Sequence, residues 1–277
     1  MPDLWTDLLT CLDLRPVPSG GTGEEHADDA VTEFEARNQQ LDYRRVFGGQ
    51  LLGQFIRIAS ATCPDKAVKS QHAVFAREGR ADEPIRYQAT RHHEGRSFAT
   101  VTITARQSHG VVATSSICMH APEDGPEHQT VDEVPAVLGP EHHVTIDMIP
   151  WEIRTTVDLN SGATGPPEFE AWMRTPAAGP ELAPALAAYA TDLTLIGTAL
   201  RPMDGVSQRG TTTAFTSAVT SHTIWFHRPF RTDEWLLLRQ NSPLLAHGRS
   251  FGRGDILTED GTLVASYAQE ALLRFAS

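Results

Sequence analysis

The sequence predicts an α+β fold built from two like halves, in each of which a helix is followed by an antiparallel sheet. Three observations support this prediction. Short motifs occur twice in the same order, each copy has one stretch with apolar residues at helical spacing, and each copy ends in stretches of alternating polar and apolar residues. These two spacings are the signatures of a half-buried helix and a half-buried strand. Two copies are too few for a solenoid, so a pair of similar units is expected.

The duplication is defined by short landmarks that keep their order and nearly keep their spacing. The landmarks are His72 before Phe75 and His222 before Trp225, Gly-Arg-Ser-Phe at 95–98 and 248–251, and an apolar run at 111–114 and 263–266. Each histidine lies three residues before its aromatic residue. We therefore expect His72 and His222 to be equivalent and to share a structural role.

Length, composition and charge restrict the class of protein. The 277 residues are 40% hydrophobic and 21% charged, which is typical of a globular chain with one large or two ordinary domains. A net charge of −12 without a basic stripe argues against nucleic acid as a partner. No apolar run is long enough for a membrane span, and neither end resembles a signal peptide or a peroxisomal address. We therefore expect a cytoplasmic location.

The cysteines and histidines predict neither a disulfide nor a metal site. Cys11, Cys63 and Cys118 have no paired spacing, so buried reduced thiols are expected. The adjacent histidines at 92–93 and 142–143 would point to opposite faces of a strand, and no cysteine or acid stands at a ligand spacing. We expect no metal and no cofactor.

The first half, residues 1–120, is expected to hold two helices and five strands. A short helix is predicted over 5–14, and a longer one over 46–61, where Phe47 and Leu51 begin a buried stripe. The strands are predicted at 31–37, 71–75, 85–92, 97–105 and 111–119. In the clearest strand, threonines alternate with apolar residues, as in a sheet with one covered face.

The second half is expected to repeat this order after a linker. Residues 121–150 contain five prolines among acids and histidines and are predicted to be that linker, which leaves 151–277 as the second domain. Its expected elements are opening strands at 151–157 and 169–174, a central helix over 182–196, and a closing sheet from Gly210 to Leu273.

The comparison of the two copies makes Gln269 a candidate functional residue. Superposing 263–266 on 111–114 places Gln269 at the position of Ile117, on a strand face that is otherwise apolar. An amide buried without hydrogen bonds costs about 1–3 kcal/mol. Gln269 is therefore either a satisfied structural amide or a group kept for a function.

Other candidates lie at helices and turns. Asp192 falls at the edge of the apolar stripe of the predicted second central helix and is either solvated or functional. Gly48 and Gly49 would let a ligand approach a helix N-terminus that can stabilise an oxyanion, although close helix packing explains them equally well. Ser250 lies in a Gly-x-Ser-x-Gly sequence, but a strand is expected after it instead of a helix, so no covalent chemistry is predicted there.

Several motifs taken together carry a family resemblance. They are Val-Phe-Gly-Gly-Gln at 46–50, Gly-Arg-Ser-Phe at 95–98, Thr-Asp-Leu at 191–193, Trp-Phe-His-Arg-Pro-Phe at 225–230, Glu-Trp-Leu-Leu at 234–237 and Val-Ala-Ser-Tyr-Ala-Gln-Glu at 264–270. This combination resembles the type-II acyl-CoA thioesterases. The resemblance implies a double hotdog fold, two tandem hotdog units each with a central helix wrapped by an antiparallel sheet. It also implies an acyl-CoA substrate, no cofactor, and assembly into homo-oligomers, either dimers or tetramers.

The resemblance further implies that three side chains hold the attacking water. The aspartate on the second central helix matches Asp192, and the glutamine on the last strand matches Gln269. The third, a serine or threonine, is replaced here by Val219, which cannot hydrogen-bond. Ser221 is two residues further on, is expected on the same strand face, and is the predicted substitute. The residues expected to contact the substrate are Gly48, Gly49, Gln50 and His222.

Three functions remain open on these grounds. The leading one is an acyl-CoA thioesterase that hydrolyses fatty acyl-CoA to free fatty acid and CoA by direct attack of water. Because Val219 replaces the hydroxyl, an acyl-CoA-binding protein with weak or lost turnover is the alternative. A hotdog hydratase or dehydratase acting on enoyl thioesters is disfavoured, since no hydratase motif is recognisable in the central-helix regions.

Overall fold

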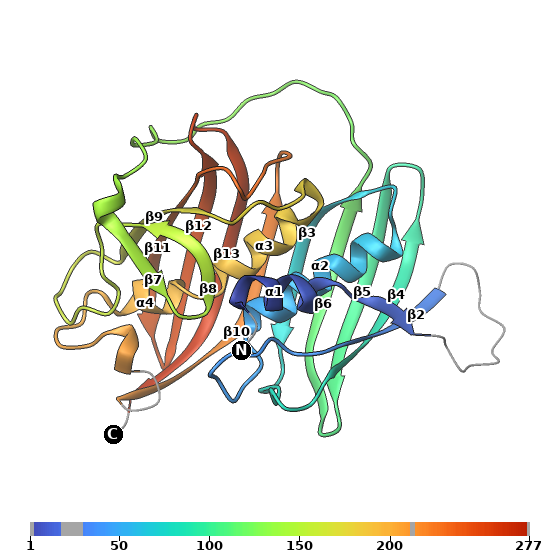
Figure 1. Cartoon of the computed structure of the whole chain (residues 1–277), viewed down its shortest axis with the longest axis horizontal. Helices are drawn as coiled ribbons and strands as arrows, with labels where there is room; N and C mark the ends of the chain where they lie inside the picture. The colour runs from blue at the N-terminus through green and yellow to red at the C-terminus, as the bar shows by residue number, and fades with distance from the viewer. Residues whose placement is uncertain (1–2, 18–29, 211–213, 276–277) are drawn as a thin grey trace. The chain divides into compact units, whose positions relative to one another are not determined.

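The computed structural model describes residues 3–17, 30–210 and 214–275 (Figure 1). The chain forms two compact units. The first unit comprises Met1–Glu127 together with Pro184–Tyr189, and the second unit comprises His128–Ala183 and Ala190–Ser277. In each unit a helix accompanies an antiparallel sheet, which confirms the predicted α+β class.

The sheet of the first unit has the strand order β1-β2-β4-β5-β6-β3, and all neighbours are antiparallel. The bounds are β1 Arg15–Val17, β2 Ala30–Ala36, β3 Ala67–Phe75, β4 Ile85–Glu94, β5 Phe98–Gln107 and β6 Gly110–His120. The five predicted strands are confirmed, and β1 is an additional short strand. In β5 the buried residues alternate with threonines, so one face of the sheet belongs to the core.

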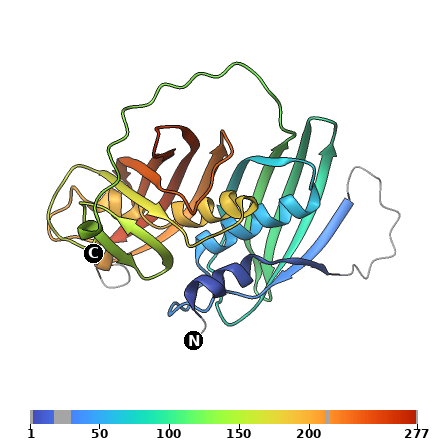
Figure 2. The same cartoon turned by 45° about the horizontal axis from the view of Figure 1, so that its top comes forward.

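Helix α2, Gly48–Thr62, lies against this sheet (Figure 2), and helix α1, Leu4–Leu12, packs on α2. Phe55 and Ile58 are completely buried on the apolar stripe that the sequence predicts.

The three cysteines differ in burial. Cys11 and Cys63 are buried, but Cys118 is exposed, which corrects the expectation of three buried thiols. The reason is strand alternation in β6, where Ile117 and Met119 take the inward positions beside it.

The sheet of the second unit has the order β10-β13-β12-β11-β9-β8-β7, also antiparallel throughout. The bounds are β7 His143–Ile146, β8 Ile149–Arg154, β9 Glu168–Arg174, β10 Phe215–Phe226, β11 Leu236–Ala246, β12 Arg249–Thr258 and β13 Leu263–Phe275, with short 3-10 helices at η1 Pro140–His142, η2 Pro180–Leu182 and η3 Gln208–Gly210. The closing sheet therefore begins at Phe215 instead of Gly210, and residues 211–213 lie outside the described residues.

The predicted linker 121–150 contains two kinds of structure. Residues 121–139 hold no helix or strand, whereas residues 140–150 contain η1 and β7. Apolar side chains between residues 131 and 138, among them Val131 and Val134, pack on the buried residues Trp172 and Leu237. This part of the segment is thus fastened to the second unit by apolar contacts.

The predicted central helix 182–196 is divided in two. Helix α3 is Ala183–Thr191 and helix α4 is Leu195–Leu200, with Asp192 as the residue after the end of α3. Threonine hydroxyls compete with helical hydrogen bonds. Thr194, at the break, donates its hydroxyl to the side chain of Gln240 on β11, which favours a break at this point. Helix α4 packs on β11 and β12 of the second unit.

The residues Pro184–Tyr189 of α3 pack on α2 within the first unit. A Cβ atom on Gly49 would collide with the backbone oxygen of Tyr189 and with the ring of Phe47, and one on Gly53 would lie 3.1 Å from the backbone oxygen of Ala185. Glycine at these positions lets the two backbones approach closely. Of the two explanations for the glycines at the start of α2, packing therefore accounts for Gly49.

Among the described residues, the stretch Pro180–Leu200 has the length and a mean hydropathy, 1.2, that would suit a membrane span. However, 78% of this window is buried inside the protein. Such burial is typical of a core helix, which passes the same test of length and composition.

Candidate functional site

Gln269 is a buried amide without a hydrogen bond. Its side chain lies on β13 between Tyr267 and Ala271 on the apolar face, and only 3% of the residue is exposed. Neither Oε1 nor Nε2 has a hydrogen-bond partner among the described residues. Of the two readings left open by the sequence, a satisfied structural amide is therefore wrong. Both functions of this amide, donor and acceptor, are available to a small molecule.

The neighbour of Gln269 across the sheet is His222. In the antiparallel pair β10 and β13, His222 is opposite Gln269 and Val219 is opposite Ala271. Opposed residues point to the same face of a sheet. His222 and Val219 therefore share the inner face with Gln269.

Ser221 does not lie on that face. A β-bulge between Val219 and Ser221 inserts Thr220, and Ser221 is paired with Glu270. A bulge adds one residue to a strand and so reverses the facing of the residues beyond it. The expectation that Ser221 shares the face of Val219 is therefore wrong, and Ser221 does not take the place of the missing hydroxyl.

His222 joins the sheet to the end of α3. The side chain is completely buried, and its Nε2 shares a hydrogen bond of 3.0 Å with the hydroxyl of Thr191. Its ring also stacks on the ring of Tyr267, with centroids 6.2 Å apart and planes 6° from parallel. This holds the residue next to Asp192 against β10.

Asp192 itself is buried, with 5% exposed, and follows Thr191 directly. Two residues beyond it, the Thr194 hydroxyl donates to Oε1 of Gln240 over 3.0 Å, so the chain is held on both sides of the carboxylate. Asp192 thus lies in a break between two helices, and the side chains of His222 and Gln240, on two different strands, hold the backbone on either side of it.

The structure corrects which residue of the first copy is equivalent to His222. Strand β3 has the same bulge, between Val68 and Ser70, and beyond it Gln71 is opposite Ile117 as His222 is opposite Gln269. The counterpart of His222 is therefore Gln71 and not His72, which is exposed. The superposition of Gln269 on Ile117 is confirmed. The signal that reveals the shift is the match of Val-Lys-Ser at 68–70 with Val-Thr-Ser at 219–221.

Gln50 belongs to an internal hydrogen-bond network of the first unit, where it is fully buried. Its Oε1 accepts from the backbone N–H of Gln39 over 2.9 Å, and its Nε2 donates to Asn38 Oδ1 at 2.9 Å and to Gln54 Oε1 at 3.2 Å. Gln39 in turn accepts a hydrogen bond of 2.9 Å from the hydroxyl of Tyr189. The hydrogen-bonding groups of Gln50 are bonded within the protein, which gives this amide a structural role; its contact with the substrate stays a prediction.

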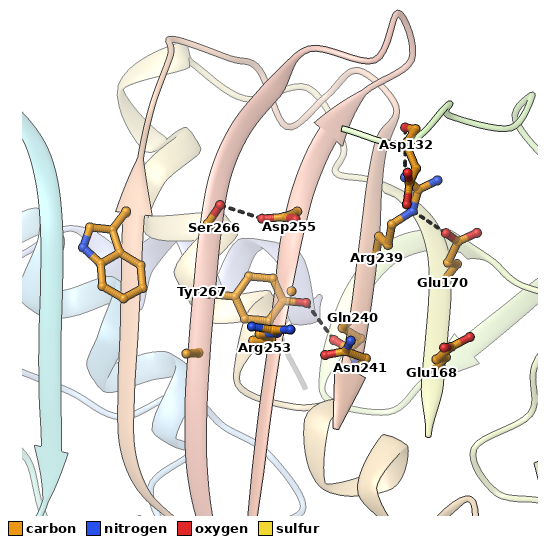
Figure 3. A pocket seen from close by; sticks show the side chains of 13 residues that line it. Asp132, Glu168, Glu170, Arg239, Gln240, Asn241, Arg253, Asp255, Ser266 and Tyr267 are labelled. Atoms are coloured by element: carbon orange, nitrogen blue, oxygen red, sulfur yellow. Dashed lines mark hydrogen bonds and ion pairs between the residues drawn. The ribbon is translucent and has the colours of Figure 1, made fainter. Parts of the chain in front are cut away.

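An open groove lies on the outer face of the second sheet (Figure 3), and none of the candidate residues lines it. On its lining Arg239 pairs with Glu170, and Asp255 accepts a hydrogen bond of 2.6 Å from Ser266. Tyr267 is drawn here as well, with its hydroxyl directed at Gln240.

Comparisons with known proteins agree on one family. Residues 39–120 match the family model of the acyl-CoA thioesterase N-terminal domain, and residues 122–273 match that of the acyl-CoA thioesterase C-terminal domain. Acyl-CoA thioesterase 2 of Haemophilus influenzae is 32% identical over 303 aligned residues, which cover 100% of both chains. Human acyl-coenzyme A thioesterase 8 is 26% identical, over 87% of this chain and 84% of the relative.

Solved structures show the same likeness. The acyl-CoA thioesterase II TesB2 from Mycobacterium marinum has a TM-score of 0.76 and 29% identity, over 98% of each chain. A hot dog fold protein of unknown function from Alicyclobacillus acidocaldarius has a TM-score of 0.71 and 16% identity, again over 98% of each chain, and so shows the fold alone. The predicted double hotdog architecture is confirmed.

Proposed function

The chain belongs to the acyl-CoA thioesterase family, and from this premise we propose that it hydrolyses fatty acyl-CoA to free fatty acid and CoA. The observation in the structure that carries the proposal is the unbonded amide of Gln269, buried on the inner face of the second sheet beside His222. A buried donor and acceptor without partners is costly unless it serves a ligand.

In the proposed reaction, Asp192 acts as the general base and Gln269 orients the attacking water. The Asp192 carboxylate takes a proton from the water as the oxygen attacks the thioester carbonyl carbon. The new C–O bond produces a tetrahedral oxyanion, which collapses with cleavage of the C–S bond. The CoA sulfur leaves as the thiolate and takes the proton that Asp192 had removed from the water, so CoA thiol and free acid are released and the carboxylate is regenerated.

The role of Gln269 follows from the two ends of its amide. Its Oε1 can accept a hydrogen bond from the water, while Nε2 can donate to an oxygen. An amide cannot remove the proton, so the chemical step needs the carboxylate as well. The burial of Asp192 and Gln269 supports this division of roles, because polar interactions are stronger where water is excluded.

Val219 favours a second candidate function, an acyl-CoA-binding protein with weak turnover. Its side chain shares the inner face with Gln269 and offers no hydrogen bond at the position where related enzymes are expected to have a hydroxyl. Ser221, on the other face, cannot compensate. A water held by two groups instead of three is less well oriented, and orientation is a large part of catalysis.

The decisive experiment measures thiol release from acyl-CoA esters of increasing chain length. We expect release by the wild-type chain and a loss of at least about 100-fold in kcat for Asp192→Asn and Gln269→Ala, the range seen when a general base or a positioned donor is removed. Activity that survives both substitutions would contradict the assigned roles. Binding of a non-hydrolysable acyl-CoA without turnover of any ester would favour the second candidate.

We also propose that the chain works in the cytoplasm as a homo-oligomer. The resemblance to the double hotdog thioesterases supports the assembly. Light scattering of the purified chain tests the assembly: a mass near 30.3 kDa would contradict it, whereas two or four times that mass is expected.

A further inference from the structure

The short segment that carries Asp192 is held by side chains on both sides. Helix α3 ends at Thr191 and α4 begins at Leu195, so residues 192–194 lie between two helices. The hydroxyl of Thr191 is bonded to His222, and the hydroxyl of Thr194 is bonded to Gln240. The position of the carboxylate therefore depends on two anchors that come from β10 and β11.

Both anchors rest on the same residue, Tyr267. Its ring stacks under His222, and its hydroxyl donates to Oε1 of Gln240 over 2.7 Å (Figure 3). Gln240 is oriented further by its Nε2, which donates to the hydroxyl of Thr198 over 2.6 Å. Burial, followed by the charge of Asp255, raises the pKa of the Tyr267 phenol well above its usual value, so the group remains a donor.

Tyr267 also belongs to the strand that carries Gln269. It lies two residues before Gln269 on β13, on the same buried face. The two groups assigned to the water are consequently fixed to one another through a single side chain.

The first unit, used as an internal comparison, lacks this arrangement. The strand register that superposes Gln269 on Ile117 superposes Tyr267 on Ser115 and His222 on Gln71. Gln71 donates to a backbone oxygen of α2, that of Leu52, over 3.1 Å, instead of to a threonine hydroxyl. The histidine and the tyrosine thus occur together only in the unit that contains Asp192 and Gln269.

We propose that Tyr267 is a positioning residue: through His222 with Thr191, and through Gln240 with Thr194, it holds Asp192 in register with Gln269. The proposal rests on the proposed function, because it assigns a purpose to the position of Asp192. Tyr267 touches neither substrate nor water in this role.

The test uses substitutions that remove one hydroxyl each in the full chain. Tyr267→Phe keeps the ring but removes the hydroxyl that donates to Gln240. Thr191→Val keeps the shape but removes the hydroxyl that is bonded to His222. We expect each to lower kcat about tenfold with KM within twofold, since a displaced group costs the reaction step and not binding. Thr191→Ser keeps the hydroxyl and is therefore expected to keep kcat within about twofold of the wild type.

Tyr87→Phe is the matched control. Tyr87 is as buried as Tyr267, and its hydroxyl also donates to a glutamine side chain, that of Gln54, but in the first unit. We expect this variant to lose comparable stability and to keep kcat. Equal losses of kcat in Tyr87→Phe and Tyr267→Phe would overturn the proposal, because the effect would then be a general result of removing a buried hydroxyl.

Hydrogen exchange measured by mass spectrometry tests, independently of activity, whether the segment that carries Asp192 is held in place. Faster exchange confined to a peptide spanning 190–196 is expected for Thr191→Val and Tyr267→Phe. Unchanged exchange there would overturn the proposal even if the wild type is a thioesterase. If the wild type releases no thiol but both variants exchange faster than the wild type at 190–196, the anchoring is upheld and the proposed function is rejected. The two failures are therefore distinguishable.

Discussion

Gln269 on β13 lies directly opposite His222 on β10, and the two buried side chains share the inner face of the second sheet. His222 is bonded to Thr191, the residue before Asp192, whereas the amide of Gln269 has no hydrogen-bond partner in the described part of the chain. His222 therefore holds the chain next to Asp192, and the hydrogen-bonding groups of Gln269 are available for a ligand.

Replacing the free amide should separate stability from activity. In Gln269→Leu the unsatisfied polar atoms are removed at similar volume, so the free energy of unfolding is expected to rise by about 1 kcal/mol or more. Activity should fall at least about 100-fold, as for loss of a positioned hydrogen-bonding group. Urea denaturation and thiol release measured on the same preparation check both parts. A drop in stability would mean that protein atoms bond this amide.

Restoring a hydroxyl at position 219 should increase turnover. Val219→Thr keeps the shape of the side chain and adds a hydrogen-bonding group on the inner face that carries Gln269. We expect kcat to increase severalfold, roughly 3–10-fold, because a third group would orient the water. Steady-state kinetics with one saturating acyl-CoA give the comparison.

Ser221→Ala is the control for that substitution. Ser221 is paired with Glu270 on the opposite face, so its removal is expected to change kcat by less than about twofold, as is usual for a group outside the site. A large loss of kcat would restore Ser221 as the third member of the site and contradict the facing produced by the bulge at Thr220.

The three cysteines should differ in reactivity. Burial, with the charge of Asp7, raises the pKa of the Cys11 thiol to about 12, so at pH 8 the thiolate that reacts is almost absent. Burial, with the charge of Glu94, also raises the pKa of Cys63, whereas Cys118 is exposed. A thiol reagent at pH 8 should modify one site rapidly, and Cys118→Ser should abolish that phase. Rapid labelling of Cys11 would show that α1 opens easily. Cys118→Ser also removes the reaction of the protein's own exposed thiol with the reagent in thiol-release assays.

Gly49 should be intolerant of a side chain. In Gly49→Ala the new Cβ would meet the backbone oxygen of Tyr189, which cannot move aside as a flexible side chain would. We expect a loss of about 1–3 kcal/mol in the free energy of unfolding, the usual range for overpacking. Thermal and urea denaturation provide the measurement. Gly125→Ala, where nothing lies within 4 Å of the added atom, is the matched control and should be nearly neutral.

Much of the architecture could be predicted from the sequence because it depends on local periodicity. Alternating residues predict β5, and the helical spacing of Phe47, Leu51 and Phe55 predicts α2, since each pattern needs one apolar face toward a core. The duplication also predicts the two units and the polar position at Gln269. These conclusions need only the order of residue types, which is why they survive comparison with the structure.

What only the tertiary structure decided is how backbone irregularities place the polar side chains. The bulge at Thr220 turns Ser221 outward and His222 inward, and it makes Gln71, not His72, the counterpart of His222. The break after Thr191 is held by hydrogen bonds to strands distant in sequence. A one-residue bulge leaves the apolar pattern almost unchanged but reverses the facing of every residue beyond it. Residue spacing alone therefore cannot specify which side chains share the inner face with Gln269.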